Sequence, residues 1–389
     1  MSLLNLVQLG TCISRASTWN PLRASGDGVF LHIDLSSVDQ DTKVISDARE
    51  MPCGEAPSRA RQLVTAGDVL VSTVRPNLNG VARVPPELDG ATASTGFCVL
   101  RPESKKIDES YLFQWVKSPT FISDMVSKAT GASYPAVSDR IIFESAIPLP
   151  PLKEQRRIAT ILDQAEILRT QRRAALAQLD SLTQSIFLDM FGDPVTNPKG
   201  WSVTKFGDVG TLDRGISKHR PRNAPELLGG SHPLVQTGEV SNCDGYIRSF
   251  KHTCSDIGLK QSKMWPVGTL CITIAANIAK TGILTFEACF PDSVVGFRAE
   301  NPAAVEYIRV WLSFLQKALE DAAPESAQKN INLAILRDLN VPLPPLPLQQ
   351  TFATRIQAIE SLKAAHRAAL AQLDALFASL QQRAFVGLL

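Results

Sequence analysis

Hydrophobic and small residues recur at alternating steps of three and four over two long stretches of the chain. Neither stretch contains Gly or Pro, and this spacing is typical of helices with one heptad-like seam. The seam positions are Ile158, Leu162, Ala165, Leu168, Arg172, Ala175, Leu179, Leu182, Ile186 and Met190 in the first stretch, and Phe352, Ile356, Ile359, Leu362, His366, Ala369, Leu373, Leu376 and Leu380 in the second. We therefore predict two long helices, each spanning about 50 Å at about 1.5 Å per residue.

The two stretches are copies of each other. Residues 147–193 align without a gap with residues 341–387, and the run Arg173–Asp180 is identical to Arg367–Asp374. Each copy begins with a Pro-rich junction that cannot be helical, and the first helix is expected to end before Gly192 and Pro194. A single duplication with a long period indicates two similar halves rather than a solenoid. We expect the helices to pair antiparallel as a rod; the alternative is that each packs on its own domain.

The residues ahead of each junction predict two domains with the same order of elements. Strand-like patterns mark residues 29–35, 67–74, 80–84 and 97–100, and helical periodicity marks 110–130, interrupted at Pro119. In the second domain, residues 234–240 take the place of the strand at 29–35, 268–274 parallel 67–73, and 305–323 parallel the helix.

The predicted fold class is therefore α/β (α+β) domains in duplicate, separated by two long α-helices that form an antiparallel coiled coil, with a pseudo-two-fold internal repeat. The predicted boundaries are 1–146 for the first domain, 147–193 for the first junction and helix, 194–340 for the second domain, and 341–389 for the second junction and helix. The domain sequences have diverged far more than the helices, which suggests two separate recognition surfaces.

Composition narrows the class of protein. A chain of 389 residues allows two or three domains, and a net charge of +2 gives no global basicity that would point to nucleic acid. The seven cysteines are scattered singly, which indicates reduced thiols in a cytoplasmic protein. The first residues lack the basic region of a signal peptide, and no apolar run is long enough to span a membrane.

The sequence offers no persuasive catalytic constellation. It has no G-x-S-x-G elbow, no phosphate-binding G-x-x-x-x-G-K-[ST] loop and no H-E-x-x-H motif. The five histidines do not cluster, and no group of carboxylates has the spacing of a magnesium site. We therefore expect no catalytic residue, no metal and no cofactor in this chain.

A basic run, Arg214–Arg222, is the most distinctive polar feature of the second domain. Gly215 and Pro221 within it favour an exposed loop, from which guanidinium groups could contact phosphates or guanine edges. The alternative is a solvated charge run and ordinary surface residues, with Tyr134 simply packed. The candidate DNA contacts are Arg214, Lys218, His219, Arg220, Arg222, Lys251, Lys280 and Lys329 in the second domain, and Arg59, Arg61, Arg75, Asn77, Arg83 and Tyr134 in the first.

The duplicated I/V-P-L-P-P-L junction with its long helix resembles the specificity (S) subunit of type I restriction-modification systems. The residues that carry the resemblance are Ile147–Gln155 with the following helix, the second copy from Val341, and the segments Lys329–Asn332 and Thr237–Val240. The resemblance covers essentially the whole chain. The second copy departs from the first at Pro347-Leu348, where the first has Lys153-Glu154.

The resemblance implies a non-catalytic subunit with two target recognition domains, each reading one half of a split double-stranded DNA sequence. It implies that the helices act as a ruler for the gap and dock two modification (methyltransferase) subunits. Those partners would carry S-adenosylmethionine and methylate adenine, and restriction (translocase/nuclease) subunits would add ATP- and Mg-dependent cleavage. On this interpretation the isolated chain binds DNA weakly.

Two other classes of function remain open on the sequence alone. A stand-alone, duplicated DNA-binding regulator would bind DNA strongly without partners. A coiled-coil scaffold with no nucleic-acid role would be insensitive to charge reversal at Arg214, Lys218, Arg220 and Arg222.

Overall fold

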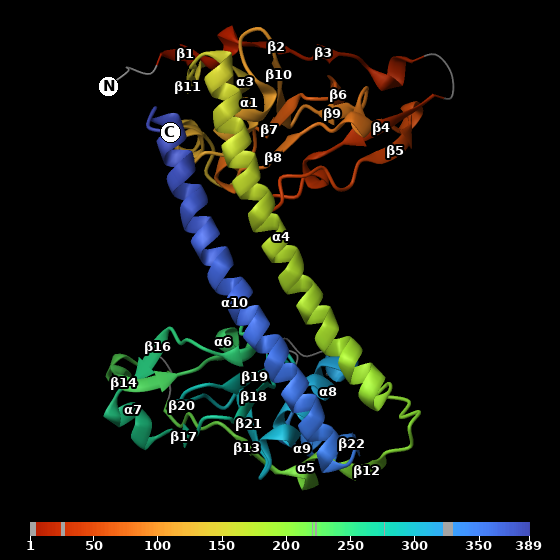
Figure 1. Ribbon diagram of the computed structural model, residues 1–389, viewed down its shortest axis with the longest axis vertical. Helices are drawn as coiled ribbons and strands as arrows, with labels where there is room; N and C mark the ends of the chain where they lie inside the picture. The colour runs from red at the N-terminus through yellow and green to blue at the C-terminus, as the bar shows by residue number, and fades with distance from the viewer. Residues whose placement is uncertain (1–4, 25–27, 220, 222–223, 276, 322–329) are drawn as a thin grey trace. The chain divides into compact units, whose positions relative to one another are not determined.

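Two helices of 40 residues each, α4 (Leu152–Phe191) and α10 (Leu346–Phe385), confirm the two predicted long helices (Figure 1). The computed structural model describes residues 5–24, 28–219, 221, 224–275, 277–321 and 330–389. Its chain divides into an N-terminal unit, Met1–Arg173 with Ala368–Leu389, and a C-terminal unit, Ala174–Arg367. Each unit therefore contains one half of α4 and one half of α10.

The described residues of the N-terminal unit form three sheets and the helices α1 (Glu109–Val116), α2 (Pro119–Lys128) and α3 (Asp139–Glu144). A short antiparallel pair joins β1 (Leu6–Gln8) to β11 (Ala146–Pro148). One sheet has the order β2-β10-β7-β8, with β2 at Ile13–Arg15, β10 at Phe97–Pro102, β7 at Val69–Ser72 and β8 at Val81–Arg83. The other has the order β3-β6-β9-β4-β5, with β3 at Ser17–Thr18, β6 at Ala60–Leu63, β9 at Thr92–Ser94, β4 at Val29–Ile33 and β5 at Arg49–Pro52.

The C-terminal unit repeats this plan. Its short antiparallel pair is β12 (Ser202–Lys205) with β22 (Asn340–Leu343). One sheet has the order β13-β21-β18-β19-β15, with β13 at Thr211–Arg214, β21 at Val294–Arg298, β18 at Leu270–Thr273, β19 at Thr281–Leu284 and β15 at Gly245–Ile247. The other has the order β16-β14-β20-β17, with β16 at His252–Cys254, β14 at Leu228–Leu234, β20 at Ala288–Cys289 and β17 at Met264–Trp265. The helices are α5 (Phe206–Val209), α6 (Thr237–Ser241), α7 (Asp256–Lys260), α8 (Pro302–Asp321) and α9 (Leu333–Asp338).

Strand pairing confirms that the two domains are duplicates. The antiparallel run β2-β10-β7-β8 corresponds to β13-β21-β18-β19, and the parallel pair β4·β9 corresponds to β14·β20. The strands predicted at 67–74, 80–84 and 97–100 are β7, β8 and β10, and the helical segment interrupted at Pro119 is α1 followed by α2.

The strand predicted at residues 234–240 is wrong. Strand β14 ends at Leu234, and helix α6 begins at Thr237. The side chain of Gln236 accepts a hydrogen bond from a backbone N–H of the first turn, and the carboxylate of Glu239 accepts one from the backbone N–H of Gln236 at 3.0 Å. This reciprocal capping starts a helix where alternation alone suggests a strand. Asp34 and Ser37 make the same kind of cap directly after β4.

The Pro-rich junctions are held in the same way in both units. The hydroxyl of Tyr111 donates to the carbonyl of Pro148 at 2.8 Å, and the hydroxyl of Tyr307 donates to that of Pro342. The amide Nε2 of Gln155 donates to the carbonyl of Pro150 at 2.8 Å, and that of Gln349 donates to Pro344 at the same distance. A backbone carbonyl that is buried away from water needs a hydrogen-bond donor, and these side chains supply one at each junction.

The aromatic core beneath each junction joins the start of one long helix to the end of the other. In the N-terminal unit, Phe385 at the end of α10 lies 5.5 Å from Tyr111 between ring centroids. In the C-terminal unit, Phe191 at the end of α4 lies 4.9 Å from Tyr307. Arg157 near the start of α4 donates to the carbonyl of Leu389 at 2.7 Å, so the two helix halves run antiparallel within this unit (Figure 1).

Burial along the helices corrects part of the predicted seam. Leu162 and Ile356 are fully buried, and Leu179, Ile186, Leu373 and Leu380 are half-buried. In contrast, Leu168, Leu182, Leu362 and Leu376 are 49%, 43%, 54% and 49% exposed. A single partner helix covers only a narrow stripe of the helix surface. Near the start of α4 the buried stripe faces the domain instead, and Ile158 and Leu162 pack in the same hydrophobic core as Tyr111. The helix halves thus pair with each other and also pack on a domain.

This division of the seam predicts unequal effects of two similar substitutions. Leu162→Ala is expected to lower the unfolding free energy of the N-terminal unit by about 2–5 kcal/mol, because it leaves a cavity in a packed core. Leu168→Ala, the matched control, should change it by less than about 0.5 kcal/mol, because that side chain is exposed. Native-state hydrogen exchange of the α1 amides measures both, and equal losses would contradict the burial pattern.

Candidate functional site

The β7–β8 hairpin of the N-terminal unit presents an arginine stacked on a tyrosine. Arg75 has a left-handed backbone (φ 51°), and its N–H donates to the carbonyl of Pro135 at 2.7 Å. Its guanidinium carbon lies 4.8 Å from the ring centroid of Tyr134, which is 68% exposed. A non-glycine residue in this backbone region costs about 1–2 kcal/mol, so the surrounding loops must hold it in place.

Hydrogen bonds gather several loops at this edge of the sheet. The N–H of Thr73 donates to Gly96, the N–H of Thr95 donates to Arg59, and the N–H of Val137 donates to Thr73, at 2.8–2.9 Å. The edge therefore carries Arg59, Arg75, Asn77 and Tyr134, and Arg61 follows two residues after Arg59 at the start of β6. We call this set of loops the first hairpin edge.

Arg83 does not belong to the first hairpin edge. It pairs with Val69 at the open end of the β7–β8 hairpin, whereas Val81 pairs with Val71 near the tip. Its guanidinium contacts the hydroxyl of Ser110 at 2.7 Å and Glu109 at 3.7 Å. Arg83 lies at the end of β8, as expected for a residue at a loop or strand end, and the antiparallel register separates it from Arg75.

Lys43 supports the first hairpin edge and was missed from the sequence. Its ammonium donates to the carbonyl of Asn79 at 2.6 Å, and burial lowers the pKa of this lysine. Asn79 also has a left-handed backbone (φ 46°), so this contact helps to fix the tip. No local pattern links Lys43 to a hairpin more than thirty residues away, and its role follows from the fold alone.

The C-terminal unit has an equivalent edge, formed by the loop between β18 and β19. The N–H of Ile331 donates to Ile274, and the N–H of Ile274 donates to Ser293, both at 3.0 Å. Asn330 forms a β-bridge with Ala275, as Ala136 does with Val74 in the first domain. Arg214, whose Nε donates to the carbonyl of Asp292, and exposed Lys280 both lie on this second hairpin edge.

The remaining candidates of the second domain fall into three groups. Lys218 and His219 are exposed and follow β13, with the N–H of His219 donating to Oε1 of Gln261 at 2.6 Å. Lys251 is exposed beside Phe250, and no contact among the described residues joins it to the second hairpin edge. Arg220, Arg222 and Lys329 lie outside the described residues.

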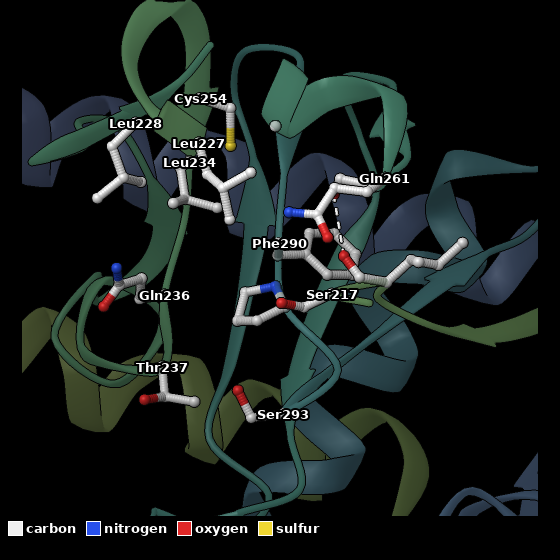
Figure 2. Close-up of a pocket in the computed structure, with 14 residues that line it drawn as sticks. Ser217, Leu227, Leu228, Leu234, Gln236, Thr237, Cys254, Gln261, Phe290 and Ser293 are labelled. Atoms are coloured by element: carbon white, nitrogen blue, oxygen red, sulfur yellow. Dashed lines mark hydrogen bonds between the residues drawn. The ribbon is translucent and has the colours of Figure 1, made fainter. Parts of the chain in front are cut away.

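A cavity of about 300 Å³ opens beside the basic run and is lined by Ile216 and Ser217. Figure 2 shows Leu227, Leu228, Leu234 and Cys254 on one side of it and Gln236, Thr237 and Ser293 on the other. A hydrogen bond from Cys289 lowers the pKa of the Cys254 thiol below its usual range. The lining is mixed, since Gln261 and Ser217 add polar groups on a third side, next to Phe290 (Figure 2).

Among the described residues, no group of three or more His, Cys, Asp or Glu side chains is placed to hold a metal ion. The described helices include none that combines the length and the apolar character needed to cross a bilayer.

Comparison with known proteins establishes the family. The model of the type I restriction modification DNA specificity domain matches residues 63–178 and 198–375, which is more than half of the chain. The chain therefore belongs to this family, and the resemblance carried by the Pro-rich junctions and their helices is confirmed.

Relatives and solved structures agree. The putative type I restriction enzyme MjaX specificity subunit of Methanocaldococcus jannaschii is 22% identical over 324 residues, which are 78% of this chain and 74% of the relative. The EcoBI specificity subunit of Escherichia coli is 23% identical over 326 residues, 75% of this chain and 68% of the relative.

Among solved structures, a chain from work on complex assembly and conformational transition of the type I R-M system has a TM-score of 0.60 and 25% identity, covering 100% of this chain and 99% of its own. The S subunit from M. genitalium has the same fold, with a TM-score of 0.61, 12% identity, and coverage of 99% and 97%.

Proposed function

We propose that this chain is the DNA specificity subunit of a type I restriction-modification complex. The observation that carries the proposal is the duplicated hairpin edge, which presents different side chains on the same backbone plan. One edge offers Arg75, Asn77 and Tyr134, and the other offers Arg214, Lys280 and Asn330. Each domain would read one half of a bipartite double-stranded DNA target, and the two halves would differ because the side chains differ.

The first hairpin edge suits direct readout of bases. An arginine can bind O6 and N7 of guanine in the major groove with two parallel hydrogen bonds, and an asparagine can bind adenine in a similar way. Tyr134 holds the guanidinium of Arg75 by stacking, which lowers the entropy lost when it docks. Arg59 and Arg61 would contact phosphates, which position the domain without reading sequence.

The second hairpin edge would use Arg214 and Lys280 in the same two roles, together with Lys218 and His219 in the segment that follows β13. With a net charge of +2, the whole chain has little long-range attraction for DNA. We therefore expect tight DNA binding only in the complete complex. Tight binding by the isolated chain would instead favour a stand-alone regulator.

The proposed division of labour follows the predicted boundaries. Residues 1–146 and 194–340 would be the reading domains, and residues 147–193 and 341–389 would supply the junctions and the helical ruler. Methylation of adenine with S-adenosylmethionine would belong to two modification subunits, and ATP- and Mg-dependent cleavage would belong to restriction subunits. This chain would contribute recognition and docking, with no catalytic step of its own.

The exposed leucines of the long helices supply a basis for docking two like partners. Leu168 and Leu376 lie in the N-terminal unit, and Leu362 and Leu182 lie in the C-terminal unit. The repeat equates Leu168 with Leu362 and Leu182 with Leu376, so each unit carries the same two positions. We call these the N-terminal and C-terminal leucine patches. Two equivalent patches fit two copies of one subunit, which is the composition expected for the modification subunits.

The function is tested by co-expressing the chain with its modification subunit and sequencing single DNA molecules for methylated adenine. The native chain should give one bipartite motif with a fixed gap. Inserting four residues after both Ala175 and Ala369 adds about 6 Å to the pair of helices. Both half-sites should persist, and the gap should lengthen by up to about two base pairs, since DNA rises about 3.4 Å per base pair. An altered half-site with an unchanged gap would contradict the ruler.

The reading role of the first hairpin edge is tested with one arginine at that edge and one away from it. Arg75→Ala should relax recognition at one base pair of one half-site. The free energy of discrimination against the wrong base there should fall by about 1–3 kcal/mol. Arg83→Ala, the matched control, should leave the motif unchanged because this side chain is engaged with Glu109 and Ser110. The same methylation sequencing measures both, and a motif insensitive to Arg75→Ala would remove this residue from the interface.

The docking role of the leucine patches is tested by stoichiometry. Leu168→Glu with Leu376→Glu should leave one modification subunit per chain, since it spoils one patch, and adding Leu182→Glu with Leu362→Glu should leave none. Each pair is expected to weaken its partner's binding by at least about tenfold. Val195→Glu, at a position 70% exposed outside the helices, is the control. Native mass spectrometry counts the subunits, and two per chain in every variant would refute the assignment.

A further inference from the structure

The two halves of the long-helix pair are joined by ion pairs of the same design. In the N-terminal unit, Nε of Arg169 on α4 lies 2.6 Å from Oδ1 of Asp374 on α10, and Nη2 of Arg173 lies 3.3 Å from the same oxygen. In the C-terminal unit, the ammonium of Lys363 on α10 pairs with Asp180 on α4. Each pair connects the two helices rather than two turns of one helix.

The internal repeat shows that these are copies of a single interaction. Arg169 corresponds to Lys363, and Asp374 corresponds to Asp180, the last residue of the identical run. In one unit α4 supplies the cation and α10 the carboxylate, and in the other unit the roles are exchanged. The interaction is therefore reciprocal between the two copies.

Apolar packing does not define the register of the helices in this region. From Glu166 to Leu182 on α4, every residue is at least partly exposed to solvent. The charged groups are better covered, since the side chains of Lys363 and Arg169 are 5% and 17% exposed. Lys363 keeps Glu360 of its own helix in any register, but its contact with Asp180 and that of Arg169 with Asp374 exist in one register only. An exposed leucine, in contrast, is tolerated in several registers.

Sliding one helix by a heptad would penalise both ion pairs. One direction places Arg169 opposite Arg367 and Lys363 opposite Arg173, which sets like charges against each other. The other direction places Lys363 opposite Phe187 and leaves both aspartates opposite leucines. Buried polar partners of this kind specify the register of coiled coils at some expense of stability.

The ion pairs also reach the recognition domains through an equivalent glutamate. Glu360, one turn before Lys363, accepts from Arg248 of the second domain at 2.8 Å and lies 3.3 Å from Lys363. Its counterpart Glu166 pairs with Lys117 of the first domain. The equivalent glutamates Glu166 and Glu360 thus each bind a long helix to its domain. One turn later, Arg169 and Lys363 bind that helix to the other long helix.

We propose that Arg169–Asp374 and Lys363–Asp180 are positioning pairs that hold α4 and α10 in a single register and thereby set the gap between the two DNA half-sites. This inference rests on the proposed function. The residues touch neither DNA nor the reacting base; they act through the helices. The gap between the half-sites would then have one length rather than a range of lengths.

Charge reversal tests the proposal in the complete complex. Asp374→Arg should reduce methylation at the native gap by at least about tenfold, since small misplacements cost about that much or more, and residual methylation should spread over other gap lengths. The double variant Arg169→Asp with Asp374→Arg restores an ion pair of opposite polarity and should recover the native gap. Arg355→Asp, an exposed reversal on α10 outside these pairs, is the control and should keep the native gap.

A second measurement separates this inference from the proposed function. Thermal unfolding of the chain without DNA should show a lower midpoint for Asp374→Arg and recovery in the double variant. If the midpoints behave in this way but the native complex gives no bipartite methylation, the proposed function is refuted while the structural role of the ion pairs stands. A native complex with one gap that Asp374→Arg leaves unchanged would overturn the register role, and so would a double variant that recovers neither gap nor midpoint.

Discussion

The structure depends on one constraint: a long helix with an exposed middle must be fixed at its ends. Each domain meets this by burying the junction tyrosine, Tyr111 or Tyr307, beneath the start of one helix and the terminal phenylalanine of the other. The tyrosine hydroxyl then donates to a proline carbonyl of the junction. Burial raises the pKa of both phenols, so the hydroxyls remain donors at any physiological pH.

The hairpin edges, which we propose as the reading surfaces, take no part in this anchoring. The hairpin edges are built from loops that satisfy one another's backbone groups, so their side chains can change without disturbing the core. Arg75 and Tyr134 illustrate the consequence, because a left-handed backbone and an exposed aromatic ring lie together outside the hydrophobic core. The equivalent loop of the second domain keeps the bridge to the following segment but carries different side chains.

Much of the fold could be predicted from the sequence, because the helices and their duplication are encoded locally. Period and proline placement locate α4 and α10, and the repeat implies two like domains. The sequence could not distinguish Leu162 from Leu168, because burial depends on the direction in which the domain lies. It also could not show that Arg83 lies away from Arg75, because the register of the hairpin is set by strand pairing. The pairing of Arg75 with Tyr134, and the support from Lys43, arise from contacts far apart in the chain.

The unequal divergence of helices and domains follows from what each surface faces. A residue of the run Arg173–Asp180 lies on a helix whose partner is its own copy, so a change in one copy alters a contact made by the other. The pairs Arg169–Asp374 and Lys363–Asp180 each tie an aspartate on one helix to a cation on the other. The side-chain contacts described at the hairpin edges, such as Arg75 on Tyr134, lie within one domain and tie no position to the other copy. Mutual complementarity therefore keeps the ruler alike in both halves, while the two reading surfaces are free to differ.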